Sequence, residues 1–249
     1  MEKLVIIPTY NEKENIKEIL QAVFDLEQEY HVLVIDDGSP DGTAQIVEEL
    51  IPAFGNTVFL EERKGKLGLG TAYIHGFKWG LSRGYQFIFE MDADFSHNPL
   101  DLERLYEACK RDGADMSIGS RYTKGGGIKN WPADRIALSK GASAYTRLIL
   151  WMPLHDPTAG FICYKRNVLE SINLDSVRFV GYAFQIEMKY AAWRLGFKIK
   201  EVPILFEDRK HGDSKMSKGI IKEGVLGVVK LRWHSLFTDY RRRVKKVFS

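Results

Sequence analysis

Two aspartates end one of the most apolar stretches of the chain, in the segment FEMDADFSHNP at residues 89–99. Asp92 and Asp94 follow closely on the apolar run 87–89 and are separated only by Ala93. Carboxylates at the end of a buried segment are costly unless water or a cation solvates them. Mg²⁺ and Mn²⁺ prefer oxygen ligands, and Mg²⁺ commonly binds one or two carboxylates together with substrate phosphates. The pattern predicts a divalent cation site that holds a nucleotide diphosphate; a turn with solvated acids is the alternative.

A second pair of carboxylates, Asp36 and Asp37, ends another apolar run within IDDGSPDGT at residues 35–43. A tight turn accounts for the glycines of this segment and for Asp41, because glycine and aspartate are typical turn residues. It does not account for two adjacent carboxylates. One of them is therefore a candidate acceptor of hydrogen bonds from a ribose or a base edge.

The segment PTYNE follows the first apolar run of the chain. Asn11 and Glu14 could form an ordinary helix cap, in which the glutamate reaches back to the cap residue. Pro8, Tyr10 and Glu12 need another explanation, since helix capping requires none of them.

Four cationic side chains stand beside glycines and serines that allow a close approach of the backbone: Arg121, Arg135, Arg209 and Lys215. Guanidinium groups match phosphate oxygens in a bidentate geometry, so these residues are candidates for phosphate binding. An ordinary solvated surface position is the alternative for each.

The histidines and cysteines predict no metal or disulfide chemistry. His97, His155 and His211 show no metal-ligand spacing with each other or with a cysteine, so we expect structural or surface positions for them. Cys109 and Cys163 are the only cysteines, and we expect small buried side chains rather than a disulfide scaffold. The cysteine count also favours a reduced, cytoplasmic compartment.

Apolar, β-branched runs alternate with helical patterns through the first half of the chain. The runs predict strands at 3–7, 32–36, 57–61, 87–91 and 116–119. The segments between them predict helices at 13–28, 42–51, 69–82 and 99–111. This alternation favours an α/β fold with a mostly parallel sheet covered by helices on both faces. Ligands of such sheets bind at the carboxyl ends of the strands, where the acidic and glycine-rich segments would meet.

The second half is less regular. A glycine-rich and mobile loop is expected at 122–135, followed by a helix at about 135–151. A strand and then a helix are expected within 158–172, a further helix at 183–195, and one strand over 198–207.

Charge is unevenly placed along the 249 residues. Residues 225–249 contain seven lysines or arginines and one acid, whereas the preceding 224 residues contain 29 basic and 32 acidic residues. The basic tail is therefore a candidate for contact with an anionic partner. The sequence shows neither a secretory signal pattern nor an uncharged apolar run that approaches the length of a membrane-spanning helix.

Eight stretches, taken in order, resemble the family-2 glycosyltransferases of the GT-A fold, and specifically the polyprenol (dolichol) phosphate mannose synthases. They are IPTYNEKENI, IDDGSPDGTA, GKLGLGTAY, MDADFSHNP, GSRY, DPTAGF, GYAFQIEM and DRKHGDSKMS. Each would be weak alone, but eight in register, from residue 6 to about residue 218, are specific. The resemblance implies a Rossmann-like GT-A catalytic domain at 1–218 and a basic amphipathic helical tail at 219–249.

The resemblance also implies an activity and its cofactor. The expected reaction is the inverting transfer of mannose from GDP-mannose to a polyprenyl monophosphate of dolichyl or undecaprenyl type, with Mg²⁺ or Mn²⁺ bound. Residues that match the family's donor site are Pro8, Tyr10, Glu12, Ile35, Asp37, Asp92, Ala93, Asp94, Arg209 and Lys215. Residues that match its acceptor-phosphate side are Arg121, Arg135 and Ser139.

The expected metal ligands are Asp92 and Asp94. Some relatives have a metal-binding glutamine two residues after the second aspartate, where this chain has Ser96. Serine is a weaker ligand, so water is the alternative at that position.

The chemistry of the reaction assigns further roles. GDP leaves as an anion, so the metal at Asp94 and the guanidinium of Arg209 would neutralise the developing charge. The nucleophile is a phosphate monoester whose second pKa is about 6, so it is mostly ionised at neutral pH and needs no general base. Arg121 would orient the two anionic partners toward each other. We therefore expect Asp94, Arg121 and Arg209 to be catalytic.

The tail has two interpretations. Its apolar residues recur every three or four positions: Leu226, Val229, Trp233, Leu236, Tyr240, Val244 and Val247. It is either an ordinary amphipathic helix packed on the body or an interfacial helix on anionic lipid. The second interpretation predicts an enzyme held peripherally on the cytoplasmic face of a membrane, by the tail or by a membrane-anchoring partner subunit.

Three rival functions stay open at this stage. The donor could be a UDP-sugar, because the base pocket cannot be read from the sequence. The acceptor could be a sugar hydroxyl, which would require a carboxylate base. A nucleotide-binding or nucleic-acid-binding module is the third rival, but the excess of basic residues is confined to the tail, so we expect no nucleic acid partner.

Overall fold

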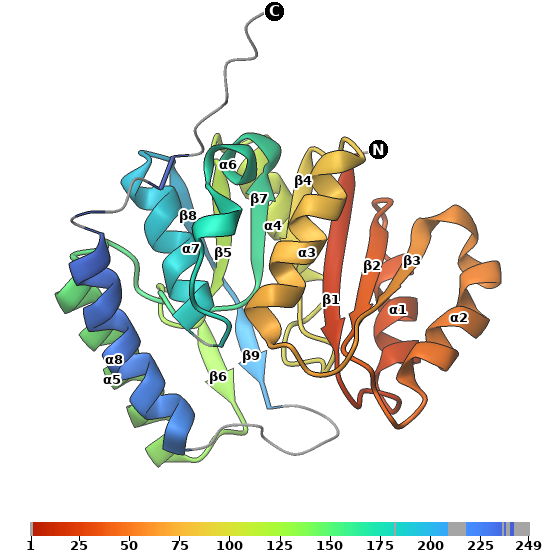
Figure 1. The fold of residues 1–249 in the computed structure, drawn as a ribbon, viewed down its shortest axis with the longest axis horizontal. Helices are drawn as coiled ribbons and strands as arrows, with labels where there is room; N and C mark the ends of the chain where they lie inside the picture. The colour runs from red at the N-terminus through yellow and green to blue at the C-terminus, as the bar shows by residue number, and fades with distance from the viewer. Residues whose placement is uncertain (1, 182, 209–217, 236, 238–239, 242–249) are drawn as a thin grey trace, which may run out of the picture.

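The apolar runs of the sequence form a seven-stranded sheet (Figure 1). The computed structural model describes residues 2–181, 183–208, 218–235, 237 and 240–241. The strands of the sheet are β1 (Lys3–Thr9), β2 (His31–Asp36), β3 (Val58–Glu62), β4 (Phe87–Glu90), β5 (Met116–Ser120), β7 (Ile162–Lys165) and β8 (Ile199–Pro203). Their order is β3-β2-β1-β4-β7-β5-β8.

The sheet is mostly parallel, as predicted. Only β7 is antiparallel to its neighbours, β4 and β5, and every other pair in the sheet is parallel. The carboxyl ends of the first five strands therefore lie at one edge. The loops that follow these five strands leave the sheet at that edge, among them the loop with Asp92 and Asp94.

Helices cover both faces of this sheet (Figure 1). They are α1 (Ile16–Phe24), α2 (Thr43–Phe54), α3 (Leu69–Ser82), α4 (Asp101–Lys110), α6 (Arg166–Ser171) and α7 (Ala183–Arg194), with short 3₁₀ turns at Gly55–Thr57 and Leu174–Ser176. Alternate strand residues face opposite sides, so Leu4 and Ile6 enter one core while Val5 and Ile7 enter the other. Both faces of β1 are therefore buried by apolar residues, as expected for a parallel sheet covered on two faces.

The predicted strand over 198–207 is wrong as a single element. It divides at Ile204 into β8 and a second strand, β9 (Leu205–Glu207), which pairs with β6 (Gly127–Lys129) in a separate two-stranded sheet. The backbone N–H of Ile204 donates to Ser120 of the large sheet, and its carbonyl accepts from Gly127 of the small one. One residue thus bridges the two sheets, and the expected loop at 122–135 contains a strand.

Helix α1 begins later than predicted. Asn11 has a φ of +58° and Asn15 occupies the N-cap position, so the helix-cap interpretation of Asn11 and Glu14 is wrong. The carbonyl of Glu12 accepts from the backbone N–H groups of Asn15 and Ile16, which forms a turn before the helix.

Two further helices, α5 (Ala133–Leu150) and α8 (Lys218–His234), run side by side at one end of the sheet (Figure 1). Val228 and Leu231 of α8 are buried in the core that also contains α7. Beyond α8, Tyr240 is buried with its ring against that of Tyr190, and its carbonyl accepts from the backbone N–H of Asn173. One face of the described tail is therefore packed on the body.

Cys109 and Cys163 are buried free thiols, as predicted. Across the described ranges of the chain, no helix has both the length and the apolar character needed to cross a membrane.

Candidate functional site

A cavity of about 610 Å³ opens at the carboxyl ends of β4 and β5 and extends between α5 and α8. Its polar lining comes from segments far apart in the sequence: Asp92, Asp94, Ser96, His97, Arg121, Arg135, Ser139, Thr158, Gln185 and Asp208. Six of these ten were singled out from the sequence as metal, phosphate or acceptor residues. The structure brings those six into one cavity.

The acidic end of the cavity is the loop after β4. The backbone N–H of Ser96 donates to Asp94 Oδ1 at 3.1 Å, and that of Asp92 donates to His97 Nδ1 at 3.1 Å. Phe95, with a φ of +61°, makes the tight bend between them. These contacts hold both carboxylates in the wall of the cavity with Ser96 beside them.

The donor set fits a hard divalent cation. Among the described residues there is no cluster of three or more histidine, cysteine or acidic side chains that could enclose a metal. Two carboxylates with an adjacent hydroxyl match Mg²⁺ or Mn²⁺, because such ions keep several waters and complete their shell with substrate phosphates. Asp92 and Asp94 would hold the ion, while Ser96 as a ligand stays a prediction.

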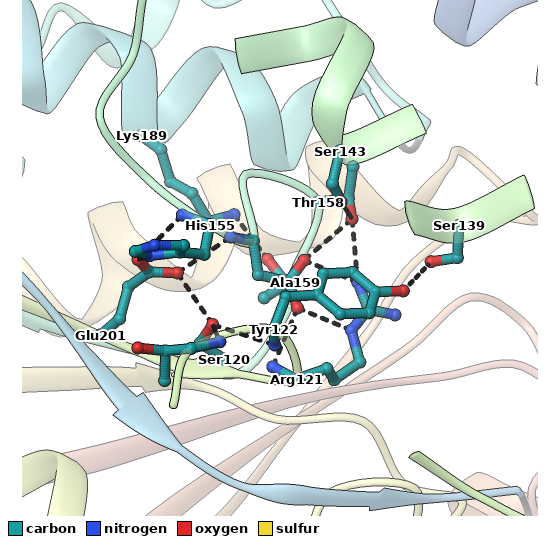
Figure 2. Close-up of polar contacts among 12 residues, drawn as sticks. Ser120, Arg121, Tyr122, Ser139, Ser143, His155, Thr158, Ala159, Lys189 and Glu201 are labelled. Atoms are coloured by element: carbon teal, nitrogen blue, oxygen red, sulfur yellow. Dashed lines mark hydrogen bonds and ion pairs between the residues drawn. The ribbon is translucent and has the colours of Figure 1, made fainter. Parts of the chain in front are cut away.

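Arg121 is held by a buried carboxylate (Figure 2). Its Nε and Nη2 donate to the two oxygens of Asp156, each at 2.7 Å, and Nη2 also donates to Thr158 Oγ1 at 2.8 Å. Burial alone would raise the pKa of Asp156, but the hydrogen bonds and charge of Arg121 hold it below its usual range. The ion pair therefore stays charged, and the guanidinium plane has one orientation.

A second carboxylate fixes the loop that carries Asp156. Glu201 Oε1 accepts from Ser120 Oγ at 2.8 Å and from the backbone N–H of Asp156 at 2.9 Å. Its Oε2 accepts from the backbone N–H of His155 and lies 2.8 Å from the Nδ1 of that ring (Figure 2). Glu201 thus ties the end of β5 to the wall that orients Arg121.

The other two predicted acceptor residues lie on α5, one helical turn apart. Arg135 Nη1 donates to both oxygens of Asp208 at 3.1 Å, and its guanidinium lies 3.8 Å from the centre of the Trp131 ring. Ser139 accepts from Tyr122 OH at 2.6 Å (Figure 2). Both line the same cavity as Arg121.

The residues predicted to hold the donor's nucleoside lie at the ends of β1 and β2. Pro8 stands beside Ile35 in the register of the sheet. The ring of Tyr10 lies 4.8 Å from Lys66 Nζ, and Glu12 accepts from Asn15 Nδ2 at 2.9 Å. These residues do not line the cavity. Ala93 lies buried between the two aspartates, and Arg209 and Lys215, with His211, fall outside the described residues.

The adjacent pair Asp36 and Asp37 has two different tasks. Asp36 accepts from Thr9 Oγ1 at 2.8 Å and from Ser39 Oγ at 2.6 Å, so it anchors the turn. Asp37 accepts from Arg63 Nε at 2.7 Å and from the backbone N–H of Leu67 at 3.1 Å. Sequence reasoning left Arg63 out, because nothing in its neighbourhood distinguishes it from a solvated arginine.

Two of the histidines are placed by the structure. His97 is buried, 2% exposed, with its ring stacked on Phe161. Burial and, more weakly, the nearby Arg121 charge lower its pKa to about 4, although Asp94 acts in the opposite direction. His155 is half exposed beside Glu201. A surface position is therefore confirmed for His155, whereas the buried His97 also lines the cavity.

A buried lysine supports the wall opposite Arg121. Lys189 on α7 donates to the carbonyls of Ala159 at 2.5 Å and Gln185 at 3.0 Å (Figure 2). Burial lowers its pKa to about 8. Sequence reasoning missed Lys189 and Glu201, because isolated charged residues give no signal until the fold buries them. It also gave no role to Asp156, although that residue begins the DPTAGF stretch.

The far end of the cavity is apolar. Leu138, Ala142 and Tyr145 of α5 line it opposite Val225 and Val228 of α8. Gly141 and Gly224 also line it, and a Cβ added at either would meet nothing within 4 Å. The site therefore has one end lined by charged side chains of both signs and another end that is open and apolar.

Comparisons with known proteins agree with this geometry. The sequence profile of the family described as Glycosyl transferase family 2 matches residues 4–172. The chain is 49% identical over 225 residues to a polyprenol monophosphomannose synthase of Mycolicibacterium smegmatis, covering 90% of this chain and 84% of that protein. It is 45% identical over 240 residues to an undecaprenyl-phosphate mannosyltransferase of Micrococcus luteus, covering 95% and 98%.

Solved structures share the fold at lower identity. One is a glucosyl-3-phosphoglycerate synthase from Mycobacterium tuberculosis in complex with Mn²⁺, uridine diphosphate and glucosyl-3-phosphoglycerate. It matches with a TM-score of 0.65 at 18% identity, over 93% of this chain and 79% of that chain. At this identity the likeness concerns the fold alone, and it agrees with the architecture expected from the motifs.

Proposed function

Because the chain belongs to glycosyl transferase family 2 and has its GT-A fold, we propose that it transfers mannose from GDP-mannose to a polyprenyl monophosphate. The product is a polyprenyl β-mannosyl phosphate, formed with inversion at the anomeric carbon. The names of the two relatives at 45–49% identity support mannose as the transferred sugar and a polyprenyl phosphate as the acceptor. GDP as the donor's nucleotide rests on the motif resemblance.

The observation that carries the proposal is the two-ended cavity. An acceptor with a charged head and a hydrocarbon chain needs cationic groups and apolar surface within one site. Arg121 and Arg135 provide the cationic groups, with the Ser139 hydroxyl in the same cavity, and the walls between α5 and α8 provide the apolar surface. A sugar hydroxyl acceptor would not need the apolar end.

A divalent cation would be held by Asp92 and Asp94, next to the diphosphate of the donor. Bound there, Mg²⁺ or Mn²⁺ would stabilise the negative charge that develops on the departing nucleoside diphosphate. Mn²⁺ in the structural neighbour supports this assignment. We propose that Arg209 also stabilises the negative charge on the departing diphosphate. Arg209 and Lys215 both lie outside the described residues.

The protein's own groups orient the acceptor phosphate. Its second pKa is about 6, so it is mostly ionised at neutral pH and attacks without a general base. Asp156 holds Arg121 in a fixed plane, so that the acceptor oxygen meets an already oriented guanidinium. Attack from the side opposite the leaving diphosphate gives inversion.

Membrane contact is proposed for the outer faces of α5 and α8. Trp151 is 70% exposed at the end of α5, and Trp233 is 67% exposed near the end of α8. The guanidinium of Arg232 lies 4.4 Å from the centre of the Trp151 ring. Exposed tryptophan beside arginine is typical of helices that lie in a lipid interface. This supports peripheral attachment to a membrane. Attachment at the cytoplasmic face, alone or with a membrane-anchoring subunit, is part of the proposal.

The test is transfer of radiolabelled mannose from GDP-mannose into a polyprenyl monophosphate. The parent should form labelled lipid, and Asp94→Asn should reduce the rate by at least about 100-fold, as expected when a group that stabilises transition-state charge is lost. Asp112→Asn is the matched control, because Asp112 is half-exposed and forms an ion pair with Lys200. Equal rates for parent and Asp94→Asn contradict the site.

The donor base is tested separately. Thermal unfolding with Mn²⁺ and either GDP or UDP should show a larger rise in Tm with GDP. Preferential stabilisation by UDP would overturn the mannose donor proposed here and favour a UDP-sugar.

A further inference from the structure

His97 lines the cavity together with Asp94 and Arg121, and the proposed function gives it no role. Its ring lies against Phe161, with centroids 4.8 Å apart and planes at 12°. Phe206 meets the ring edge-on at 5.6 Å. A ring packed on two sides in this way has one orientation, so its two nitrogens have different surroundings.

The structure determines which ring nitrogen carries the proton. Nδ1 lies 3.1 Å from the backbone nitrogen of Asp92. A backbone N–H can only donate, so Nδ1 must be the acceptor and cannot carry a hydrogen. The neutral ring therefore has its proton on Nε2.

Nε2 keeps some accessible surface in a residue that lines the cavity. It forms no hydrogen bond with any residue of the described ranges, and it is not among the polar atoms there that are sealed from solvent without a partner. His97 is one of the residues that line the cavity. A donor N–H is thus directed into the site at a fixed position.

This donor cannot take two of the roles usual for histidine. With a hydrogen on Nε2 and the lone pair of Nδ1 occupied, the ring offers no free lone pair to a metal at Asp92 and Asp94. For the same reason it cannot remove a proton from a substrate. What it offers is a neutral N–H in the cavity that Asp94 and Arg121 also line.

We infer that His97 Nε2–H donates a hydrogen bond to a phosphate oxygen of a substrate bound in the cavity. The inference rests on the proposed function only in taking the substrate to be a phosphate ester. Two sources share this chemistry, the diphosphate of the donor and the monophosphate of the acceptor. A neutral donor suits this place, because it adds a hydrogen bond to the phosphate without placing a second positive charge near the metal.

Two substitutions separate this binding role from a purely structural one, in which His97 only holds the loop through the Nδ1 contact with Asp92. In His97→Asn the amide oxygen can take the place of Nδ1 and keep the Asp92 contact, but the N–H at the position of Nε2 is lost. In His97→Gln the longer amide reaches the position of Nε2 and can donate there, while the Nδ1 acceptor is lost. If His97 binds phosphate, His97→Asn should lose more affinity than His97→Gln. If His97 only anchors the loop, His97→Gln should lose more.

Binding is measured by calorimetry, independently of turnover. One arm uses GDP with Mn²⁺, and the other uses a short-chain prenyl monophosphate without donor. His97→Asn should weaken one of the two ligands by about 10- to 100-fold, the range for a hydrogen bond to a charged group, and His97→Gln should weaken it less. The arm that responds identifies the phosphate. Unchanged affinity of His97→Asn for both ligands, or a larger loss in His97→Gln, overturns the inference.

The premise has its own test in the parent protein. The ¹⁵N chemical shifts of the His97 ring distinguish a protonated nitrogen from one with a lone pair. Protonated Nε2 and unprotonated Nδ1 are expected, with the Nε2 signal moving when the phosphate ligand binds. A proton on Nδ1 overturns the inference even if a variant fails to fold. Absence of mannosyl transfer by the parent would overturn the proposed function and leave these binding results interpretable.

Discussion

Asp156→Ala tests whether the fold holds Arg121 in place for the reaction. Asp156 is completely buried and accepts two side-chain hydrogen bonds and one backbone hydrogen bond from Arg121, whose own side chain is 9% exposed. Removal of one partner leaves a buried guanidinium without its charge partner, which costs about 3–5 kcal/mol of unfolding free energy. For a chain of this size each kcal/mol lowers Tm by roughly 2–4 °C, so the expected loss is roughly 6–20 °C.

The same substitution should slow the reaction. Displacement of a positioning group by about 1 Å lowers catalytic efficiency by about 100-fold. We expect kcat/KM for the acceptor to fall by about this factor, measured at a temperature at which parent and variant are both folded. The matched control is Asp112→Asn, because its exposed ion pair with Lys200 contributes at most about 1 kcal/mol.

The pH dependence gives a second measurement on the same pair. The folded-state pKa of Asp156 is lowered from its ordinary value. A lowered pKa means that the stabilisation is present above the unfolded value, about 3.9, and is lost as the pH falls through the folded value. The difference in Tm between parent and Asp156→Asn should therefore shrink below about pH 4. If Asp156→Ala lowers Tm by less than about 2 °C at neutral pH and leaves kcat/KM unchanged, the positioning role is refuted.

Four more outcomes are expected. Chelation of divalent metal should abolish transfer and remove the rise in Tm caused by GDP, and re-addition of Mn²⁺ should restore both. Arg135→Lys keeps the charge but loses the planar guanidinium that lies 3.8 Å from the centre of the Trp131 ring, so KM for the acceptor should rise about tenfold while GDP affinity stays unchanged. Gly141→Phe should fill the apolar end and raise KM for a long-chain acceptor by at least about tenfold, with a short-chain prenyl phosphate as the unaffected control. Trp233→Gln should weaken sedimentation with anionic vesicles about tenfold without changing GDP binding; equal binding by parent and variant would contradict the membrane face.

The sequence was a good guide to elements with a strong period. Parallel strands buried on both faces need continuous apolar runs, and such runs can be read without any tertiary information. The division of 198–207 into β8 and β9 could not be read, because both halves have strand composition. Only the contacts of Ile204 with Ser120 and Gly127 decide where one sheet ends and the next begins.

Candidate site residues were predictable where residue type and position were both unusual. Asp92 and Asp94 end an apolar run, which marks them without a structure. Asp156 begins the DPTAGF stretch, but no local pattern gave it a role, and the surroundings of Glu201 do not separate it from a surface acid. Their importance comes from burial and from partners 35 and 81 residues away in the chain, Arg121 and Ser120.

By itself the sequence determined the α/β order of the chain, the strand-end loops that carry its chemistry and, through its motifs, the family. These are local properties, since hydrophobic period and residue type act over a few positions. The tertiary structure decided that six predicted residues share one cavity, that α5 and α8 give it an apolar end, and which nitrogen of His97 carries the proton. These depend on contacts between distant segments, and only packing of the whole chain creates them.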